Sequence, residues 1–324
     1  MNFIDRPDLP QALVRALINS GSDYHVKLDE YFAGIDKSSY DYAISVTKMP
    51  EPPRIIELTK RHPDDIYQDP EDLLWSMQGT IIHGLIEQNA RDIDIAEKRI
   101  GITVPLKIDD KTVRVHFHGQ MDLYEPDSEK MFDFKYTSPK SMMYEVKESY
   151  IFQLNVLAIL AEMTMGIIPK VLCDTFIMKD WKKDDCIKLK DRGYPDRAIV
   201  VAPQPVWNKI TTKKLMVKYA KEHYRSQFIK NDNELPFCTR TQRWQNDPVY
   251  KLYKRTQAGH ISKNACRSSN DREELHDYIQ TELAGLSEED YEIKTIEAKP
   301  SRCIGYCSVS GLCNQRQAEL AVNK

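Results

Sequence analysis

Two aspartates and a lysine near the middle of the chain have the residue types and spacing of a metal-dependent hydrolytic site. Asp122 ends the segment GQMD, and eleven residues later Asp133 opens the segment DFK, which ends at Lys135. Because side chains alternate along a strand, Asp133 and Lys135 share one face. A turn through EPDSEK would place Asp122 close to Asp133, and two carboxylates on one rim suit Mg²⁺. A lysine beside them can orient or deprotonate a metal-activated water, which is the nucleophile in phosphodiester hydrolysis.

Other side chains before and after this hairpin could complete the site. His83 lies in GTIIHGLIE, and Glu87 follows one helical turn later on the same face. A neutral imidazole would add a softer ligand, which favours Mn²⁺ over Mg²⁺. Gln153 lies on the helix predicted after the DFK strand, where it could brace the lysine or contact a phosphate.

These residues depend on a series of helices and strands that the hydrophobic pattern predicts. Apolar residues at helical spacing predict helices, and alternating or short apolar runs predict strands. The predicted helices cover residues 11–20, 71–90, 141–165, 207–230 and 269–283. The predicted strands cover residues 112–119, 119–125, 130–136, 171–178, 198–206, 249–256 and 291–298.

The strand at 112–119 also contains a His-x-His pair, whose spacing could bind a metal. Val115 and Phe117 point to one side of this strand, whereas His116 and His118 point to the other. Their place opposite the apolar side chains predicts a solvated face for the two histidines.

The order of the site residues distinguishes them, since each feature is common on its own. A helix with His83 precedes a strand with Asp122, a strand with Asp133 and Lys135, and a helix with Gln153. This series, in the segments GTIIHG, GQMD, DFK and YIFQLNVL, resembles the PD-(D/E)XK nuclease superfamily. The similarity is greatest to its RecB-like branch, which includes CRISPR-associated exonucleases. The flanking segment SVTKMPEPPRIIELTKRH is similar to phage-encoded members.

The resemblance implies a role for each matching residue. The metal ligands would be His83, Asp122, Asp133 and the backbone carbonyl of Phe134. Lys135 would be the catalytic lysine, and Gln153 would belong to the Gln-x-x-x-Tyr motif of the family. The chain departs from that motif, because Leu157 stands where the family has tyrosine. Tyr150, one turn before Gln153, could substitute for it.

Cysteines near the end of the chain form a second candidate metal site. Three of the seven cysteines, Cys303, Cys307 and Cys313, follow the pattern C-x3-C-x5-C, and Cys238 is the expected fourth ligand. Cys266 is the less favoured choice for that place. Four thiolates fit either a zinc ion or a [4Fe–4S] cluster. RecB-like nucleases with a C-terminal four-cysteine cluster have a similar terminal triplet, so the resemblance favours iron–sulfur over zinc.

Composition excludes some classes of protein. The chain has 324 residues, 41% of them hydrophobic and 29% charged, with a mean hydropathy of −0.56. No apolar run approaches the roughly 18 residues of a membrane span, and the segment MNFIDRPDLP lacks the apolar core of a secretory signal. We therefore expect a cytoplasmic protein, located in the host cytoplasm if a phage encodes it.

Charge is nearly balanced over the chain but uneven along it. The net charge is −3, yet residues 170–230 contain 15 Lys/Arg against 7 Asp/Glu. Aromatic residues are mixed into this stretch, a pattern that also suits single-stranded nucleic acid. We favour the simpler interpretation, a solvated amphipathic helix whose aromatic residues face the core.

Together these observations predict an α/β fold in two parts. Residues 1–235 would form a nuclease domain with an N-terminal helical extension and a restriction-endonuclease-like mixed sheet flanked by helices. Residues 236–324 would form a small α+β region around the cysteine cluster. The predicted function is metal-dependent hydrolysis of DNA by an exonuclease. Two alternatives remain open: an inactive DNA-binding accessory protein of the same fold, and a module that works with a helicase or recombinase. The sequence does not fix the oligomeric state.

Overall fold

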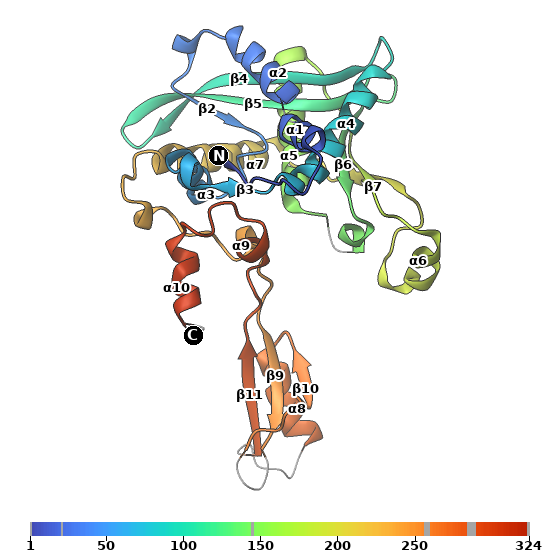
Figure 1. The fold of residues 1–324 in the computed structure, drawn as a ribbon, viewed down its shortest axis with the longest axis vertical. Coiled ribbons are helices and arrows are strands. Elements are labelled where there is room, and N and C mark those ends of the chain that lie inside the picture. The colour runs from blue at the N-terminus through green and yellow to red at the C-terminus, as the bar shows by residue number, and fades with distance from the viewer. Residues whose placement is uncertain (1, 21, 144–145, 256–259, 284–289, 323–324) are drawn as a thin grey trace. The chain divides into compact units, whose positions relative to one another are not determined.

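The computed structural model describes the chain except for residues 1, 21, 144–145, 256–259, 284–289 and 323–324 (Figure 1). The chain divides into two compact units. The first contains residues 1–53 and 60–230, and the second contains residues 54–59 and 231–324.

A mixed six-stranded sheet organises the first unit, in agreement with the α/β class predicted from the sequence. Its strands are β2 (Tyr42–Ser45), β4 (Ile95–Ile108), β5 (Lys111–Glu125), β6 (Lys130–Thr137), β7 (Val171–Met178) and β8 (Ile199–Gln204). The order is β2-β5-β6-β7-β8, with β4 paired to β5. A separate parallel pair joins β1 (Asn2–Phe3) to β3 (Tyr67–Gln68).

The long strand β5 is the centre of this sheet, because three strands pair with it. β4 runs antiparallel along one edge of β5 for nearly its whole length. On the other edge, β2 pairs in parallel with residues 115–118 and β6 pairs antiparallel with residues 123–125. The β5–β6 hairpin agrees with the prediction that a turn through EPDSEK joins the segments of Asp122 and Asp133.

Helices complete the first unit. They are α1 (Gln11–Asn19), α2 (Ser22–Ala33), α4 (Leu74–Gln88), α5 (Glu148–Met165), α6 (Lys183–Lys188) and α7 (Lys209–Ser226). Most of α3 (Pro53–Arg61), residues 54–59, belongs to the second unit. Short 3₁₀ turns occur at η1 (Lys37–Ser39), η2 (Pro63–Asp65), η3 (Pro70–Leu73), η4 (Pro139–Met143) and η5 (Lys190–Arg192). The helix predicted over 141–165 begins later, at Glu148, and ends at Met165, where Gly166 caps it in the left-handed conformation that glycine favours.

The helix α5 packs closely on β5 because of one glycine. A Cβ atom at Gly119 would lie 2.7 Å from Leu157 Cδ2 and 2.9 Å from Val46 Cγ2, so a larger residue has no room there. Leu157 is fully buried in the core between α5 and the sheet. The glycine of the GQMD segment therefore fixes the distance between β5 and the helix that carries Gln153.

The prediction of a solvated face for His116 and His118 is wrong. Both side chains are buried, beneath aromatic residues of α2 and the following segment. Tyr31 contributes its hydroxyl to a 3.0 Å hydrogen bond with His116 Nε2, and Phe32 packs edge-on against His118. The alternation along β5 was correctly assigned, but both faces of the strand are covered at this point.

The basic helix predicted over 207–230 is confirmed as α7, which spans residues 209–226, and the aromatic residues of this stretch face the core as expected except for Phe228, which is 66% exposed. Trp207, Tyr219 and Tyr224 pack against the main core. Lys209 pairs with Glu162 on α5 and Arg225 pairs with Asp109, so part of the positive charge is offset within the unit.

The second unit contains a three-stranded antiparallel sheet in the order β10-β9-β11. Its strands are β9 (Val249–Lys254), β10 (Arg267–Ser269) and β11 (Tyr291–Ile296), and its helices are α8 (Arg272–Glu282), α9 (Ser301–Gly305) and α10 (Asn314–Val322). Two 3₁₀ turns are η6 (Asp232–Glu234) and η7 (Thr241–Arg243). Leu252, Leu275, Ile279 and Tyr291 form its small apolar core.

Candidate metal centre and active site

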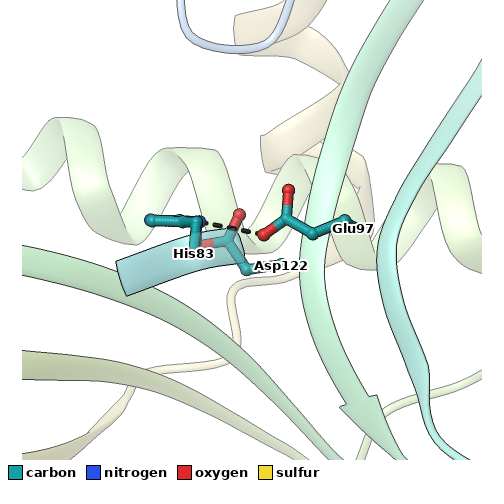
Figure 2. A group of neighbouring side chains, drawn as sticks. All are labelled: His83, Glu97 and Asp122. Carbon is teal, nitrogen blue, oxygen red and sulfur yellow. Dashed lines mark hydrogen bonds and ion pairs between the residues drawn. The ribbon is translucent and has the colours of Figure 1, made fainter. Parts of the chain in front are cut away.

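A histidine and two carboxylates from three elements converge beside the β5–β6 hairpin (Figure 2). His83 comes from α4, Glu97 from β4 and Asp122 from β5, and their ligand atoms lie within 4.8 Å of one another. His83 Nδ1 is 2.9 Å from Glu97 Oε1 and 3.8 Å from Asp122 Oδ2. One imidazole and two carboxylates are a donor set suited to Mn²⁺ or Mg²⁺.

Glu97 reaches this set through an unusual backbone conformation. The β4–β5 register pairs residue 96 with 123 and residue 98 with 121, which places Glu97 opposite Asp122. Glu97 has a φ of 48°, a left-handed value that few residues other than glycine adopt. Its other oxygen, Oε2, accepts a hydrogen bond from Gln120 Nε2. The carboxylate is thus held at both oxygens, at the cost of local backbone strain.

Asp133 and Lys135 form a second, directly adjacent group around Gln153. Asp133 Oδ1 accepts a 2.7 Å hydrogen bond from Gln153 Nε2, while Lys135 Nζ donates to Gln153 Oε1 at 3.2 Å. Lys135 also pairs with Asp133 Oδ2, and its ammonium lies 4.6 Å from the centre of the Tyr150 ring. Gln153 therefore braces the lysine, one of the two roles the sequence suggested for it.

Asp122 links the two groups through the backbone. Its Oδ2 accepts a 2.8 Å hydrogen bond from the Phe134 N–H, between Asp133 and Lys135. The ring of Phe134 lies edge-on to the His83 imidazole, with 6.1 Å between the centroids. Residues predicted as ligands and as catalytic groups therefore occupy one continuous site.

Burial and neighbouring charges shift the pKa values of Asp122 and His83 upward, with a different balance of causes for each. Burial raises the pKa of Asp122 to about 8, and the charge of Asp133 adds to the effect while His83 opposes it. For His83, burial disfavours the protonated form, but the hydrogen bond to Glu97 and the charges of Asp122 and Asp133 outweigh it and raise its pKa to about 9. The site thus holds protons that a divalent cation would displace.

Asp174 on β7 is a further buried acid next to the site. It pairs in register with Asp133, is 0% exposed, and neither carboxylate oxygen has a hydrogen-bond partner. Burial, followed by the charge of Asp133, raises its pKa to about 7, although Lys135 opposes this. An ionised carboxylate without partners in such a place is unfavourable, so Asp174 favours its protonated, uncharged form in the absence of a cation.

Three further residues that the sequence singled out do not lie among the candidate metal ligands. Glu87 does not join the metal set, because its carboxylate pairs with Lys27 Nζ at 2.7 Å on the surface. Leu157, at the position of the family tyrosine, is a core residue. Tyr150 is the aromatic residue that contacts Lys135.

Sequence reasoning missed Glu97 and Asp174. Glu97 lies in AEKR, where charged neighbours indicate an exposed segment, and only the pairing of β4 with β5 brings it to His83. Asp174 carried a usable signal, since it is the one acid inside the apolar run VLCDTFIM. An acidic residue within a strand that is otherwise buried marks a candidate functional position.

The four cysteines predicted as cluster ligands line one pocket in the second unit. Cys238, Cys303, Cys307 and Cys313 share it with Arg54, Arg243 and Arg302, among others. In the part of the chain that the structure describes, no three of their sulfur atoms lie as close together as the ligand atoms of His83, Glu97 and Asp122. Burial and the neighbouring thiols raise the pKa of Cys238 to about 12, and burial raises that of Cys307. These thiols therefore stay protonated unless a cation binds.

Comparisons with known proteins leave the family of this chain open. No protein-family model matches the sequence, and no curated protein matches it. Among solved structures, the chain is similar to SSO0001, with a TM-score of 0.40 and 13% identity over 67% of this chain and 86% of that one. Values this low do not carry function from one protein to the other. Within the described residues, no helix is both long and apolar enough to cross a membrane.

Proposed function

We propose that the chain is a divalent-metal-dependent deoxyribonuclease of the RecB-like PD-(D/E)XK type, with a restriction-endonuclease-like fold. The observation that carries the proposal is the joining of Asp122, Asp133 and Lys135 into one buried site through Gln153 and the Phe134 N–H. Four buried carboxyl groups concentrated around one lysine and one histidine form a site for cations, and hydrolysis of a phosphodiester is the chemistry that such a site serves.

Each residue of the site has a distinct role in this proposal. His83, Asp122 and Asp133 would hold one or two Mg²⁺ or Mn²⁺ ions, together with the Phe134 carbonyl, and Glu97 adds a carboxylate that the sequence did not suggest. A bound ion of this kind lowers the pKa of a coordinated water and stabilises charge on the phosphate. Lys135 keeps a proton on Nζ and orients the attacking water, and Gln153 fixes the position of that ammonium.

The proposal extends to substrate, location and partners. The substrate is DNA with free ends, either single-stranded or duplex, cleaved by an exonuclease during DNA processing, recombination or repair in the cytoplasm. A helicase or recombinase would supply those ends, since this chain shows no phosphate-binding loop of its own: GTIIHGLI lacks the Lys-Ser/Thr that follows in a P-loop.

The cysteine pocket is proposed to hold a structural [4Fe–4S] cluster, with zinc as the alternative. Thiolate is the ligand that both prefer, so the donor set fits either. The preference for iron–sulfur over zinc rests on the resemblance of Cys303, Cys307 and Cys313 to the terminal triplet of RecB-like nucleases. The spacing of the free thiols does not distinguish the two metals, because metal binding would draw the sulfurs together.

One experiment tests the proposed activity. Purified protein is mixed with end-labelled single-stranded DNA, labelled linear duplex and a closed circle, each with EDTA, Mg²⁺ or Mn²⁺, and the Asp133→Asn variant is run beside it. We expect metal-dependent loss of the linear substrates, an intact circle, and no cleavage by the variant. Wild-type rates in Asp133→Asn would refute the site, and cleavage of the circle would make the enzyme an endonuclease.

The second candidate is an accessory DNA-binding protein of the same fold that does not cleave DNA on its own. The raised pKa values of His83 and Asp122 favour it in one respect, because a protonated site binds cations weakly. DNA binding without cleavage under Mn²⁺, at pH values up to 9, would support this function.

A further inference from the structure

Large aromatic side chains are exposed around the cysteine pocket of the second unit. Phe237 is 62% exposed, Trp244 43% and Tyr306 74%. The rings of Trp244 and Tyr306 pack against each other, with 5.3 Å between centroids and 53° between planes. Because exposed aromatic surface that gathers in one place marks an interaction site, we ask which partner this group fits.

Each end of this group has an arginine stacked on an aromatic ring. The Arg302 guanidinium lies 5.4 Å from the Trp244 ring centre, and the Arg54 guanidinium lies 4.8 Å from that of Phe237. Both arginines also line the cysteine pocket, which places the two pairs around one feature. Arg302 donates to the Gln242 carbonyl at 3.2 Å and Arg54 donates to the Pro236 carbonyl at 3.1 Å. These hydrogen bonds therefore fix both arginine–aromatic pairs in the absence of a bound partner.

The backbone of Trp244 is in a conformation that disfavours tryptophan. Its φ of 52° and ψ of 45° are left-handed, at the C-terminal end of η7, where glycine or asparagine is the usual residue. Two hydrogen bonds keep it there: the Trp244 N–H donates to the Thr241 carbonyl at 3.0 Å, and Ser301 Oγ donates to the Trp244 carbonyl at 2.9 Å. A strained position filled by a half-exposed indole indicates selection for the ring rather than for stability.

Charge in the surrounding sequence favours an anionic partner. Residues 235–247 and 297–316 contain five Lys/Arg against two Asp/Glu. Flat rings, stacked arginines and excess positive charge together match a strand whose bases are free to stack and whose backbone carries phosphates. Bases in a duplex are already stacked, so they cannot use such rings.

We propose that Phe237, Trp244 and Tyr306 form a base-stacking platform for single-stranded nucleic acid. Arg54 and Arg302 hold the rings, and Arg302 also contributes positive charge for the strand. The choice of DNA as the nucleic acid rests on the proposed function, whereas the preference for single strands follows from the platform itself. Stacking is tolerant of sequence, because every base has a flat face.

The test measures binding of fluorescein-labelled oligo-dT by anisotropy, with the full chain in EDTA at fixed salt. Trp244→Gly removes the ring but also relieves the left-handed backbone, so a purely structural role of the ring predicts that thermal stability falls and that any loss of affinity follows that fall. We expect the affinity to fall by about 5- to 150-fold with stability retained, the range for loss of one stacked base. Trp244→Phe keeps a ring and should bind within about threefold of wild type.

Two further variants sharpen the result. Tyr306→Ala should also lower the affinity for oligo-dT by about 5- to 150-fold. Phe228→Ala is the control, because Phe228 is a similarly exposed aromatic residue of the first unit, and this variant should bind oligo-dT like wild type. A labelled duplex of the same length should bind equally to wild type and Trp244→Gly. Unchanged oligo-dT affinity in both Trp244→Gly and Tyr306→Ala would overturn the platform and reassign the aromatic group to a protein partner.

The experiments can refute the base-stacking proposal and the nuclease proposal independently of each other. If the nuclease proposal is wrong, Asp133→Asn and wild type behave alike with Mg²⁺ or Mn²⁺, yet the loss of binding in Trp244→Gly is still seen in EDTA. If the platform is wrong, Trp244→Gly binds like wild type, and metal-dependent cleavage still disappears in Asp133→Asn.

Discussion

Glu97 lies opposite Asp122 across the β4–β5 pair, and both carboxyl groups approach the same nitrogen of His83. The left-handed backbone at Glu97 and its second hydrogen bond from Gln120 show that this approach is enforced by the fold. In the proposed cation site, Glu97 is therefore a carboxylate to be counted with Asp122 and Asp133.

Glu97→Gln is expected to weaken Mn²⁺ binding by at least about 10- to 100-fold, because it removes one carboxylate of the proposed donor set and also the charged partner of His83, and loss of a ligand's partner alone has an effect of this size. The amide still accepts a hydrogen bond from His83 but carries no charge. Calorimetric titration of Mn²⁺ measures the effect, with Glu87→Gln as the matched control, because Glu87 pairs with Lys27 on the surface. Equal loss in both variants would show that the effect is not specific to the site.

The sequence predicted those parts of the site that lie within one hairpin and its flanking helices. Asp122, Asp133 and Lys135 follow from strand alternation, and Gln153 follows from the helix after them. Glu97 could not be predicted in this way, because its place depends on the register of β4 against β5, a contact that the local pattern does not encode. A residue that a neighbouring strand brings to a site cannot be identified from local sequence alone, because the register between the two strands is not known from it.

Gln153→Leu is expected to lower the rate of DNA cleavage at saturating Mn²⁺ by about 10- to 100-fold, with a smaller loss of Mn²⁺ affinity because Asp133 keeps its pairing with Lys135. The variant loses the hydrogen bonds to Asp133 and Lys135, and a small misplacement of a catalytic group has an effect of this size. Single-turnover cleavage and Mn²⁺ titration separate the two quantities. Glu162→Gln on the same helix is the control, and an equally large fall in metal affinity would assign Gln153 to the metal site instead.

Asp174→Asn is expected to stabilise the protein at alkaline pH in EDTA. The folded state raises the pKa of Asp174 from 3.8 to about 7, so between these values it keeps a proton that the unfolded chain releases. Stability therefore falls as pH rises from about 4 to about 7, by about 1–4 kcal/mol in all. Urea unfolding should show the variant more stable than wild type at pH 8 and similar at pH 4.

The control for this prediction is Asp184→Asn on α6, an exposed acid that should leave the pH dependence of wild type unchanged. If Asp174→Asn instead followed the wild-type curve at every pH, the carboxyl group would not be the buried acid that the structure describes.

Protein purified without oxygen is expected to contain iron and acid-labile sulfide in equal amounts, with broad visible absorbance. Cys313→Ser should lose both, because Cys313 is a buried member of the four-cysteine pocket. Cys173→Ser is the matched control, a buried cysteine on β7 of the first unit. Zinc without sulfide in the wild type would establish the alternative metal, and wild-type iron content in Cys313→Ser would exclude that residue as a ligand.

The two histidines of β5 show that strand alternation predicts which face a side chain lies on but not whether that face is buried. Alternation correctly placed His116 and His118 on the face opposite Val115 and Phe117, but it does not reveal what covers that face. Here α2 supplies Tyr31 and Phe32, and the histidines become neutral core residues. Burial lowers the pKa of both, and for His118 the neighbouring His116 and Arg99 add to the effect and bring it to about 4.

His118 is therefore expected to make the first unit sensitive to acid. Between pH 6.5 and about 4 the unfolded chain binds a proton that the folded state excludes, so stability is lost as pH falls through this range, by about 3 kcal/mol. His118→Gln should unfold at lower urea concentration than wild type at pH 8, where packing against Phe32 is lost. At pH 5 the difference should shrink or reverse. Near-UV circular dichroism follows the transition, with His276→Gln on α8 as the control. A constant difference between pH 8 and pH 5 would show that His118 is not the acid-sensitive group.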